Sequence, residues 1–467
     1  MPVRDRLALT VGLVSPSFSA YDDQMPAGFG ETRRTVAARF AELLSRRFTV
    51  VFPGLIRDEG DAERANVALR EQHLDAVVYA PTMVAPPSYP LRALARVEAP
   101  IVIWNAPEID RLPTRWEHAQ ATAHTTTVGA VMLANVLVRQ GRTPIVVTAD
   151  PTDHAAVIRM LRTVAGAAAG GALRGAVALR IGGWIPGYDD VASSATQLAQ
   201  LGIAEHDIGI EELQRASERV DPAAATALTD DLSARGWDVE EDGATAASAT
   251  LALALEDLVA THGARFGTIN CHGCLFRQSE TVGITACLAV SLLTEHGTPF
   301  SCTGDQPAAI ALAVGKLLTG ASQYCECYTP ERDTGLLMIA AGGEGDPAWA
   351  DEGEPVRVRP NTYYSGKRGA GASLVYRLRR GPATLLSLTP AAERWRLVWA
   401  TGVVEEARYP ELGGPNGMFR FDSGPAHEII SHWIAAGPTH HHALAPGKLD
   451  LELPALADAL RIEQHRV

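Results

Sequence analysis

The sequence has no long hydrophobic run, no excess of positive charge and none of the common nucleotide-binding or hydrolase motifs. No window approaches the roughly 18 uninterrupted apolar residues of a membrane span. Acidic residues number 54 against 41 Lys and Arg, so the net charge is -13, and neither nucleic acid nor an anionic membrane surface is an expected partner. The N-terminus carries only a short apolar run and no signal-peptide cleavage site, which predicts a cytoplasmic protein.

The missing motifs are those that would fix a mechanism directly. The chain contains no G-x-x-x-x-G-K-S/T loop, no G-x-G-x-x-G fingerprint, no H-E-x-x-H helix and no G-x-S-x-G elbow. Its 467 residues, 46% of them hydrophobic and 20% charged, are nevertheless typical of a globular protein with more than one core.

The cysteines are confined to one stretch of the chain and comprise Cys271, Cys274, Cys287, Cys302, Cys325 and Cys327. The first two have the C-x-x-C spacing of a zinc or redox site, and the last two could complete a four-cysteine zinc site. The middle two, in an apolar helix and at a strand end, would behave as small buried hydrophobic residues. A zinc site, a redox pair and simple burial stay open, and burial is the favoured reading.

Residues 1–125 alternate short β-rich runs with helical segments, which is the pattern of parallel β-α-β units. LALTVGLV and LDAVVYAPT predict buried strands, and ETRRTVAARFAELLSRR predicts a helix. In such sheets ligands bind beyond the carboxyl ends of the strands, here Ser15–Ser17, Thr82–Met83 and Trp104–Asn105. We predict an N-terminal α/β domain over these residues.

The same alternation begins again in residues 126–332, which predicts a central α/β domain. Within it, HAAVIRMLRTVAGAAAGGALRG predicts a helix followed by a loose Ala/Gly stretch. In residues 333–467, runs such as VRVRPNTYY and WRLVWATGVVE predict an antiparallel sheet or small barrel. The predicted fold class is α/β, with two doubly wound parallel-sheet domains of Rossmann or flavodoxin type and then a β-rich domain.

Three groups of polar residues could carry chemistry. His440–His442 follow an amphipathic helix in a Gly-Pro turn, where one imidazole could bind a divalent metal; the alternative is a solvated loop. Asp305 lies between a predicted strand and helix and could cap the helix; alternatively, either Asp305 or Thr303 faces an active-site cleft. Glu326 lies between two cysteines in a strand-like run, and alternation puts it on the opposite face from them. A carboxylate there is costly to bury unless it is paired or metal-bound, and the alternative is an exposed strand end.

These segments, taken in order, resemble the L-arabinose isomerase and L-fucose isomerase superfamily. Residues 284–320 look like its helix–strand–(C/G)EGD–helix unit, and HWIAAGPTHHHA looks like its WILAGGAHH ending. HAQATAHT is similar to its NQ-x-AHG stretch, and GPATLLSLTPAAERWRLVWA resembles strands of its C-terminal β-domain. The resemblance implies a metal-dependent aldose–ketose isomerase that acts on an open-chain sugar through an enediol, and that forms homo-oligomers, either trimers or hexamers.

In that family a divalent metal, usually Mn2+, holds two sugar oxygens while carboxylates move a proton between the first two carbons. By position, the resemblance implies metal ligands at Glu326 and His441, and it makes Glu326 the catalytic carboxylate as well. Asp305 is our candidate for a further metal ligand and a second catalytic carboxylate. Gln120 and His124 would bind substrate, and the family histidine at the latter position reaches a neighbouring subunit's site.

The chain departs from the family at two ligand positions. Thr303 stands where the family motif has its first Glu, and the extra histidine of the arabinose branch falls near Ala340–Ala341. The possible replacements are Asp305, Glu280, His272 and Glu344.

Three functions therefore stay open: an isomerase with altered ligands, a same-fold enzyme with different sugar chemistry, and a non-catalytic sugar-binding protein. The sequence does not identify the sugar. Lys367 and Arg368 could meet an anionic substituent or lie in a solvated turn.

Overall fold

The computed structural model describes residues 9–240, 242–270, 283–361, 371–406 and 411–467. The chain forms two compact units. The N-terminal unit comprises Ala8–Leu173 and Asp450–Arg461, and the C-terminal unit includes Arg174–Leu449 and Ile462–Val467. The division between the two units falls at residue 173, because β6 (Ile145–Thr148) pairs with the N-terminal sheet. The domain boundary at residue 125 stays a prediction. The separation of a central from a C-terminal domain at residue 332 stays a prediction.

The N-terminal unit is built on a parallel sheet with the strand order β2-β1-β4-β5-β6, which is the order of flavodoxin-like doubly wound sheets. A short further strand, β3, pairs with the end of β1. The parallel α/β architecture predicted from the alternating runs is thus confirmed. The strands are β1 (Thr10–Pro16), β2 (Thr49–Val51), β3 (Leu55–Ile56), β4 (Ala76–Tyr79), β5 (Ile101–Asn105) and β6 (Ile145–Thr148).

Different helices cover the two faces of this sheet. Tyr79 of β4 and Ile103 of β5 lie in a core that also holds side chains of α2, α3 and α5. The next residue of β5, Trp104, faces the other way because side chains alternate along a strand, and its ring lies 4.7 Å from that of Phe40 in α1. The helices are η1 (Ser19–Gln24), α1 (Phe29–Ser45), α2 (Glu59–Arg70), α3 (Ser88–Ala93), α4 (His118–Ala123), α5 (Thr126–Arg139), α6 (His154–Leu173) and α14 (Glu452–Leu460).

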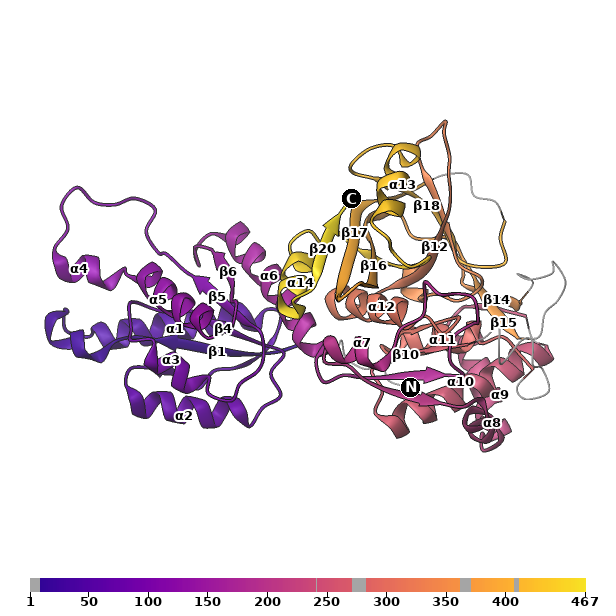
Figure 1. Cartoon of the computed structure of the whole chain (residues 1–467), viewed down its shortest axis with the longest axis horizontal. Coiled ribbons are helices and arrows are strands. Elements are labelled where there is room, and N and C mark those ends of the chain that lie inside the picture. Colours follow the sequence, from indigo (N-terminus) through magenta and orange to yellow (C-terminus); the bar gives the residue numbers. More distant parts are fainter. Residues whose placement is uncertain (1–8, 241, 271–282, 362–370, 407–410) are drawn as a thin grey trace. The chain divides into compact units, whose positions relative to one another are not determined.

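Helix α6 is longer than the sequence predicts, because the Ala/Gly stretch continues it as far as Leu173. Figure 1 shows α14, in yellow, returning from the end of the chain to lie beside α6. A Cβ atom at Gly166 would lie 2.0 Å from the carbonyl oxygen of Glu452, so only glycine permits this approach of the two helices. The prediction of a loose stretch was wrong, since its small residues serve close helix packing.

Replacing Gly166 by alanine should destabilise the protein by about 1–3 kcal/mol, the cost of forcing extra atoms into a packed contact. Alanine is the better helix former by about 1 kcal/mol, so a loss of stability isolates the steric effect. Gly243→Ala, at the start of α10 (Gly243–His262), is the matched control, since a Cβ there meets nothing within 4 Å. Urea unfolding would compare the two variants. A Gly166→Ala protein as stable as the control would contradict the close packing.

The C-terminal unit begins with a second parallel sheet, in the order β11-β10-β7-β8. Its strands are β7 (Val177–Ile181), β8 (Ala204–Ile208), β10 (Phe266–Ile269) and β11 (Phe300–Ser301). The helices that accompany them are α7 (Ala195–Gln200), α8 (Ile210–Glu218), α9 (Pro222–Ala234), α10 (Gly243–His262), α11 (Cys287–Glu295) and α12 (Gln306–Thr319).

A closed antiparallel barrel of six strands follows, in the circular order β16-β19-β12-β13-β18-β17 and back to β16. This confirms the predicted antiparallel sheet or small barrel; its strands are orange to yellow in Figure 1. They are β12 (Gln323–Pro330), β13 (Leu337–Ala340), β16 (Gly381–Ala391), β17 (Arg394–Glu405), β18 (Asn416–Phe421) and β19 (His441–Pro446). The other elements are η3 (Pro347–Trp349), α13 (Ala426–Ala435), β20 (Glu463–Arg466), which pairs with β17, and a small sheet of β9 (Asp238–Val239), β14 (Arg357–Pro360) and β15 (Ala372–Val375).

Helix α12 joins the parallel sheet to the barrel. It contacts β10 and β11 on one side and β16 and β19 on the other. Near its end, Lys316 forms a buried ion pair with Asp346, with Nζ 2.8 Å from Oδ2, and the same carboxylate accepts from the backbone N–H of Ser322. At the start of α12, Oδ2 of its capping residue Asp305 lies 2.8 Å from Nδ1 of His441, the first residue of β19, and the candidate site lies here.

Two helices of the described chain, α6 and α10, are long and apolar enough to cross a membrane by length and composition. Within α6, 67% of the most apolar window is buried inside the protein, and within α10 the share is 50%. Core helices of globular proteins have the same property, so these two helices are weak evidence for a membrane span.

Candidate active site

Asp305 and His441 form a buried pair at the start of α12. Oδ1 of Asp305 accepts from the backbone N–H of Ala308 at 2.8 Å, which is the helix-capping interaction that the sequence allowed. Its Oδ2 lies 2.8 Å from Nδ1 of His441. Both side chains are at most 2% exposed. One carboxylate thus caps a helix and orients an imidazole from a strand that lies 136 residues away in the sequence.

The protonation of this pair decides what His441 can bind. Burial raises the pKa of Asp305 to about 8, and the backbone N–H of Ala308 acts in the opposite direction. When Asp305 is ionised, Nδ1–H of His441 donates to it, and Nε2 is the unprotonated nitrogen of the ring. A histidine held in this way by a carboxylate is the usual arrangement behind a metal ligand.

The turn before Asp305 has an uncommon backbone. Thr303 adopts a φ of 62° and Gly304 a φ of 80°. A positive φ is strained for a β-branched residue, and the Thr303 hydroxyl donates to the carbonyl oxygen of Cys302 at 2.6 Å. Gly304 is required sterically, because a Cβ there would lie 2.3 Å from the carbonyl oxygen of Gly183. The residue at the position of the family's first Glu therefore supplies a hydroxyl and no carboxylate.

Glu326 lies on the other side of the His441 ring. The pairing of β12 with β19 sets Glu326 opposite His441 and Cys325 opposite His442. Oε1 of Glu326 is 3.9 Å from Nε2 of His441, and its side chain is 29% exposed. Burial raises the pKa of Glu326, and the nearby His440 lowers it. The predicted alternation is confirmed, since Cys327 shares the opposite face and has its Sγ 3.8 Å from Nδ1 of His442.

The three histidines have different surroundings. His442 is buried, accepts from Nε1–H of Trp433 at 3.0 Å, and has its pKa lowered by burial to about 3, so it is neutral. His440 is half-buried, with Nδ1 2.5 Å from Oδ2 of Asp190 and its ring centroid 3.7 Å from that of His441. The prediction that all three histidines lie in a Gly-Pro turn was wrong for His441 and His442, because both belong to β19, a strand of the barrel that begins at His441.

Two further buried residues, Glu344 and Tyr324, lie near Asp305, Glu326 and His441, and these five residues form the Asp305 cluster. Glu344 is 6% exposed, and burial raises its pKa to about 7, with a further contribution from the charge of Glu326. Tyr324 has its ring 4.9 Å from that of His441. Burial raises the pKa of Tyr324, and the charges of Glu344, Glu326 and Asp305 add to the effect. In the described part of the chain, these three carboxylates form no ion pair with Lys or Arg.

Sequence reasoning missed Tyr324 and Asp190. The first stands two residues before Glu326 in the same strand, so strand alternation could have placed both side chains on the His441 face. The second had no signal, because 250 residues separate it from His440. Asp305, Glu326 and His441, by contrast, were selected from the sequence and lie together in the structure.

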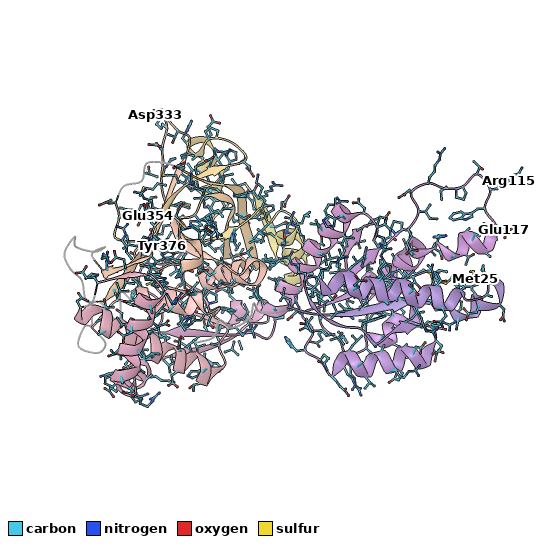
Figure 2. All side chains as sticks on the ribbon, turned by 180° about the vertical axis from the view of Figure 1, so that it is seen from behind. Met25, Arg115, Glu117, Asp333, Glu354 and Tyr376 are labelled. Atoms are coloured by element: carbon cyan, nitrogen blue, oxygen red, sulfur yellow. The ribbon has the colours of Figure 1, made fainter. Side chains whose placement is uncertain are left out.

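Gln120 and His124 belong to the N-terminal unit, whereas the Asp305 cluster belongs to the C-terminal unit. Oε1 of Gln120 accepts from the backbone N–H of Glu117 at 3.2 Å and so caps α4. The ring of His124 stacks on that of Trp116 with centroids 5.5 Å apart, and burial lowers the pKa of His124. Figure 2 shows Arg115 and Glu117 on the loop that leads into α4.

Several residues selected from the sequence lie outside the described residues. They are the C-x-x-C cysteines, two of the possible replacement ligands and the two basic residues of the Gly-rich turn: Cys271, Cys274, His272, Glu280, Lys367 and Arg368. The other four cysteines are free thiols, with Cys287, Cys302 and Cys325 buried and Cys327 partly so. Among the residues that the structure does describe, no group of three His, Cys, Asp or Glu side chains has the spacing of a metal site.

Comparison with known proteins confirms the resemblance. The family of the L-arabinose isomerase C-terminal domain matches residues 321–463. The L-arabinose isomerase of Thermotoga maritima is 32% identical over 186 residues, which are 38% of this chain and 36% of that protein. The enzymes of Escherichia coli O7:K1 and Salmonella typhi are 29% and 28% identical over 204 residues, 37% of this chain and 40% of each relative. The chain thus matches two fifths or less of the length of these relatives.

Proposed function

We propose that this chain, which resembles L-arabinose isomerases most clearly in its C-terminal domain, is a divalent-metal-dependent aldose–ketose isomerase acting on an open-chain sugar. The observation that carries the proposal is the alignment of Asp305, His441 and Glu326, in which one carboxylate orients an imidazole and another faces its second nitrogen. The same resemblance is our ground for proposing a cytoplasmic homo-oligomer in which Gln120 and His124 contact the substrate.

The donor set suits a divalent cation such as Mn2+. Imidazole nitrogen and carboxylate oxygen are both ligands that Mn2+ accepts. No Lys or Arg of the described residues forms an ion pair with Asp305, Glu326 or Glu344, and burial raises the pKa of all three carboxyl groups. Their ionised forms are costly to bury unless a cation offsets the charge. His441 and Glu326 would hold the metal, with substrate oxygens and water at the remaining positions.

Asp305 has a different role from the ligand role that the sequence suggested. Both of its oxygens are engaged, one by the N–H of Ala308 and the other by Nδ1 of His441. We therefore assign Asp305 to the orientation of His441 rather than to direct contact with the metal. Carboxylates in this position raise the basicity of the histidine and fix its tautomer.

The chemistry follows from these positions. When bound, the metal supplies Lewis-acid stabilisation of the charge on the two sugar oxygens. Glu326 moves the proton between the first two carbons, and its partial burial makes its carboxylate a stronger base. Glu344, with a pKa near 7, is a second carboxyl group within electrostatic reach that can hold a proton at neutral pH.

The experiment that tests the proposal is sugar conversion in deuterated solvent. Purified protein with added Mn2+ is incubated with a panel of aldoses headed by L-arabinose, the sugar in the relatives' names. We expect a ketose that carries deuterium on its first carbon, loss of activity on chelation and recovery with Mn2+. Conversion that needs no metal and incorporates no deuterium would instead indicate different sugar chemistry. Sugar binding without conversion would indicate a binding protein.

Metal binding should also stabilise the fold. At about 100 times its dissociation constant, Mn2+ should add about 2.7 kcal/mol to the free energy of unfolding, because it binds the native state alone. His441→Ala should remove the effect, while His432→Ala, at an exposed histidine of α13, should keep it. Thermal unfolding with and without Mn2+ measures the shift. Equal stabilisation of both variants would mean that the metal binds elsewhere.

A further inference from the structure

We propose that Trp184 and Tyr188 form a stacking surface for the ring form of the sugar substrate, beside the Asp305–His441 pair. The inference rests on the proposed function and adds a binding site to it. Both residues belong to the loop of residues 182–194, between β7 and α7. Their side chains are 40% and 41% exposed, although large aromatic side chains are mostly buried in this protein.

One end of the loop is fixed to the turn that precedes Asp305. The backbone N–H of Ile185 donates to the carbonyl oxygen of Thr303 at 3.3 Å. A Cβ at Gly304 would lie 2.4 Å from Cα of Trp184, so the two backbones are in contact. The indole of Trp184 therefore starts from a backbone position that touches the strand–helix turn of the site.

The other end of the loop is fixed to the histidine segment. Oδ2 of Asp190 accepts from the backbone N–H of His440 at 3.1 Å and lies 2.5 Å from Nδ1 of the same residue. The ring of Tyr188 has its centroid 5.6 Å from that of His440, whose own ring packs on His441. The phenol and the indole thus flank the two segments that hold the Asp305–His441 pair.

A buried arginine packs against the indole ring of Trp184. Cζ of Arg180 lies 5.1 Å from the centroid of the Trp184 ring. Arg180 is 3% exposed and is held by Glu205, at 2.8 Å, and by the carbonyl oxygen of Ser193, at 2.7 Å. The Trp184 ring packs against this fixed cation and is 40% exposed, and a ring that is already held in place loses little conformational entropy when a ligand stacks on it.

The chemical class of the ligand follows from the two rings. The face of an aromatic ring is apolar and carries partial negative charge, so it accepts the C–H face of a sugar ring, while the phenol hydroxyl can bond to a sugar hydroxyl. An open-chain sugar presents no such flat face. The surface therefore suits the pyranose form in which an aldose is mostly present in water, before ring opening delivers the carbonyl to the metal.

The test compares two ligands that cannot react. Methyl β-L-arabinopyranoside is locked as a ring, and L-arabinitol is permanently open. In calorimetry with the Mn2+-loaded protein, Trp184→Ala should weaken binding of the pyranoside about tenfold, the loss of roughly one aromatic contact. The dissociation constant for arabinitol should stay within about twofold of that of the parent protein. With substrate, KM should rise by a similar factor and kcat should change little.

Two further variants keep the comparison clean. Trp237→Ala is the matched control, because Trp237 also stacks under an arginine, with Arg235 at 4.7 Å, but outside the cluster. Tyr188→Ala should reproduce the effect of Trp184→Ala at an independent, exposed position.

Equal weakening of the binding of both ligands, or no weakening of pyranoside binding, would overturn the stacking surface while leaving the isomerase proposal intact. Absence of Mn2+ binding and of binding of both ligands would overturn the isomerase proposal itself, and the stacking surface with it.

Discussion

Replacing Glu326 by glutamine should lower kcat/KM for the aldose by about 10²- to 10⁴-fold, the usual contribution of a positioned acid–base group. Glutamine keeps the size of the side chain but can neither accept the proton nor place a negative oxygen opposite Nε2 of His441. The strand pairing that holds residue 326 opposite His441 uses backbone groups, so the barrel should fold as before. Initial rates with Mn2+ present, at several sugar concentrations, measure the loss.

Glu331→Gln is the control for this prediction. Glu331 follows directly after β12, is exposed and hydrogen bonds to Thr334, so its replacement removes a carboxylate of similar sequence context outside the cluster. Its kcat/KM should stay within about twofold of the parent value, since exposed substitutions away from a site have small effects. Full activity of the Glu326→Gln variant would exclude Glu326 as the group that moves the proton.

Asp305→Asn should lower the affinity for Mn2+ by about 10- to 100-fold, the usual effect of removing a carboxylate behind a ligating histidine. The amide oxygen can keep the helix cap by accepting from Ala308. The amide nitrogen then faces Nδ1 of His441 and donates to it, because Nδ1 is 2.8 Å from that position in the parent protein. The ring proton is forced onto Nε2, which blocks the nitrogen proposed to bind the metal.

Titration calorimetry with Mn2+ and thermal unfolding separate the tautomer effect from the capping effect. Asp305→Ala should lose metal affinity and also about 0.5–2 kcal/mol of stability, because the cap disappears. Asp242→Asn changes another capping aspartate, at the start of α10, and should alter neither quantity much. Unchanged Mn2+ affinity in Asp305→Asn would show that Asp305 does not control the tautomer of His441.

The fold was largely predictable from the sequence, and what was not predicted concerns contacts between segments that are distant in the sequence. Alternating runs predicted both parallel sheets because each β-α-β unit carries its own hydrophobic period. The Ala/Gly stretch around Gly166 was misread, since its purpose is contact with Glu452, which only the folded chain brings near. The pairing of β6 with β5, which adds residues 145–148 to the N-terminal sheet, was not predicted, because pairing partners leave no local pattern in the sequence.

The members of the candidate site were selected from the sequence, but the contacts between them were not predicted. Glu326, Asp305 and His441 were selected from residue type and from resemblance, and strand alternation gave the correct face for Glu326. The sequence did not reveal that the carboxylate of Asp305 would contact Nδ1 of His441. Trp184 and Tyr188 had no signal, because an exposed aromatic residue in a loop has no periodicity to mark it.

The sequence by itself determined the α/β class, the change to a β-rich barrel and the alternation that separates Glu326 from its cysteine neighbours. These features depend on periods of a few residues, which the chain carries wherever it folds. Only the tertiary structure decided which carboxylate orients His441 and which loop stands beside it, since 136 and 250 residues separate those partners. Such contacts arise from the packing of α12 between the sheet and the barrel, and packing is a property of the whole fold.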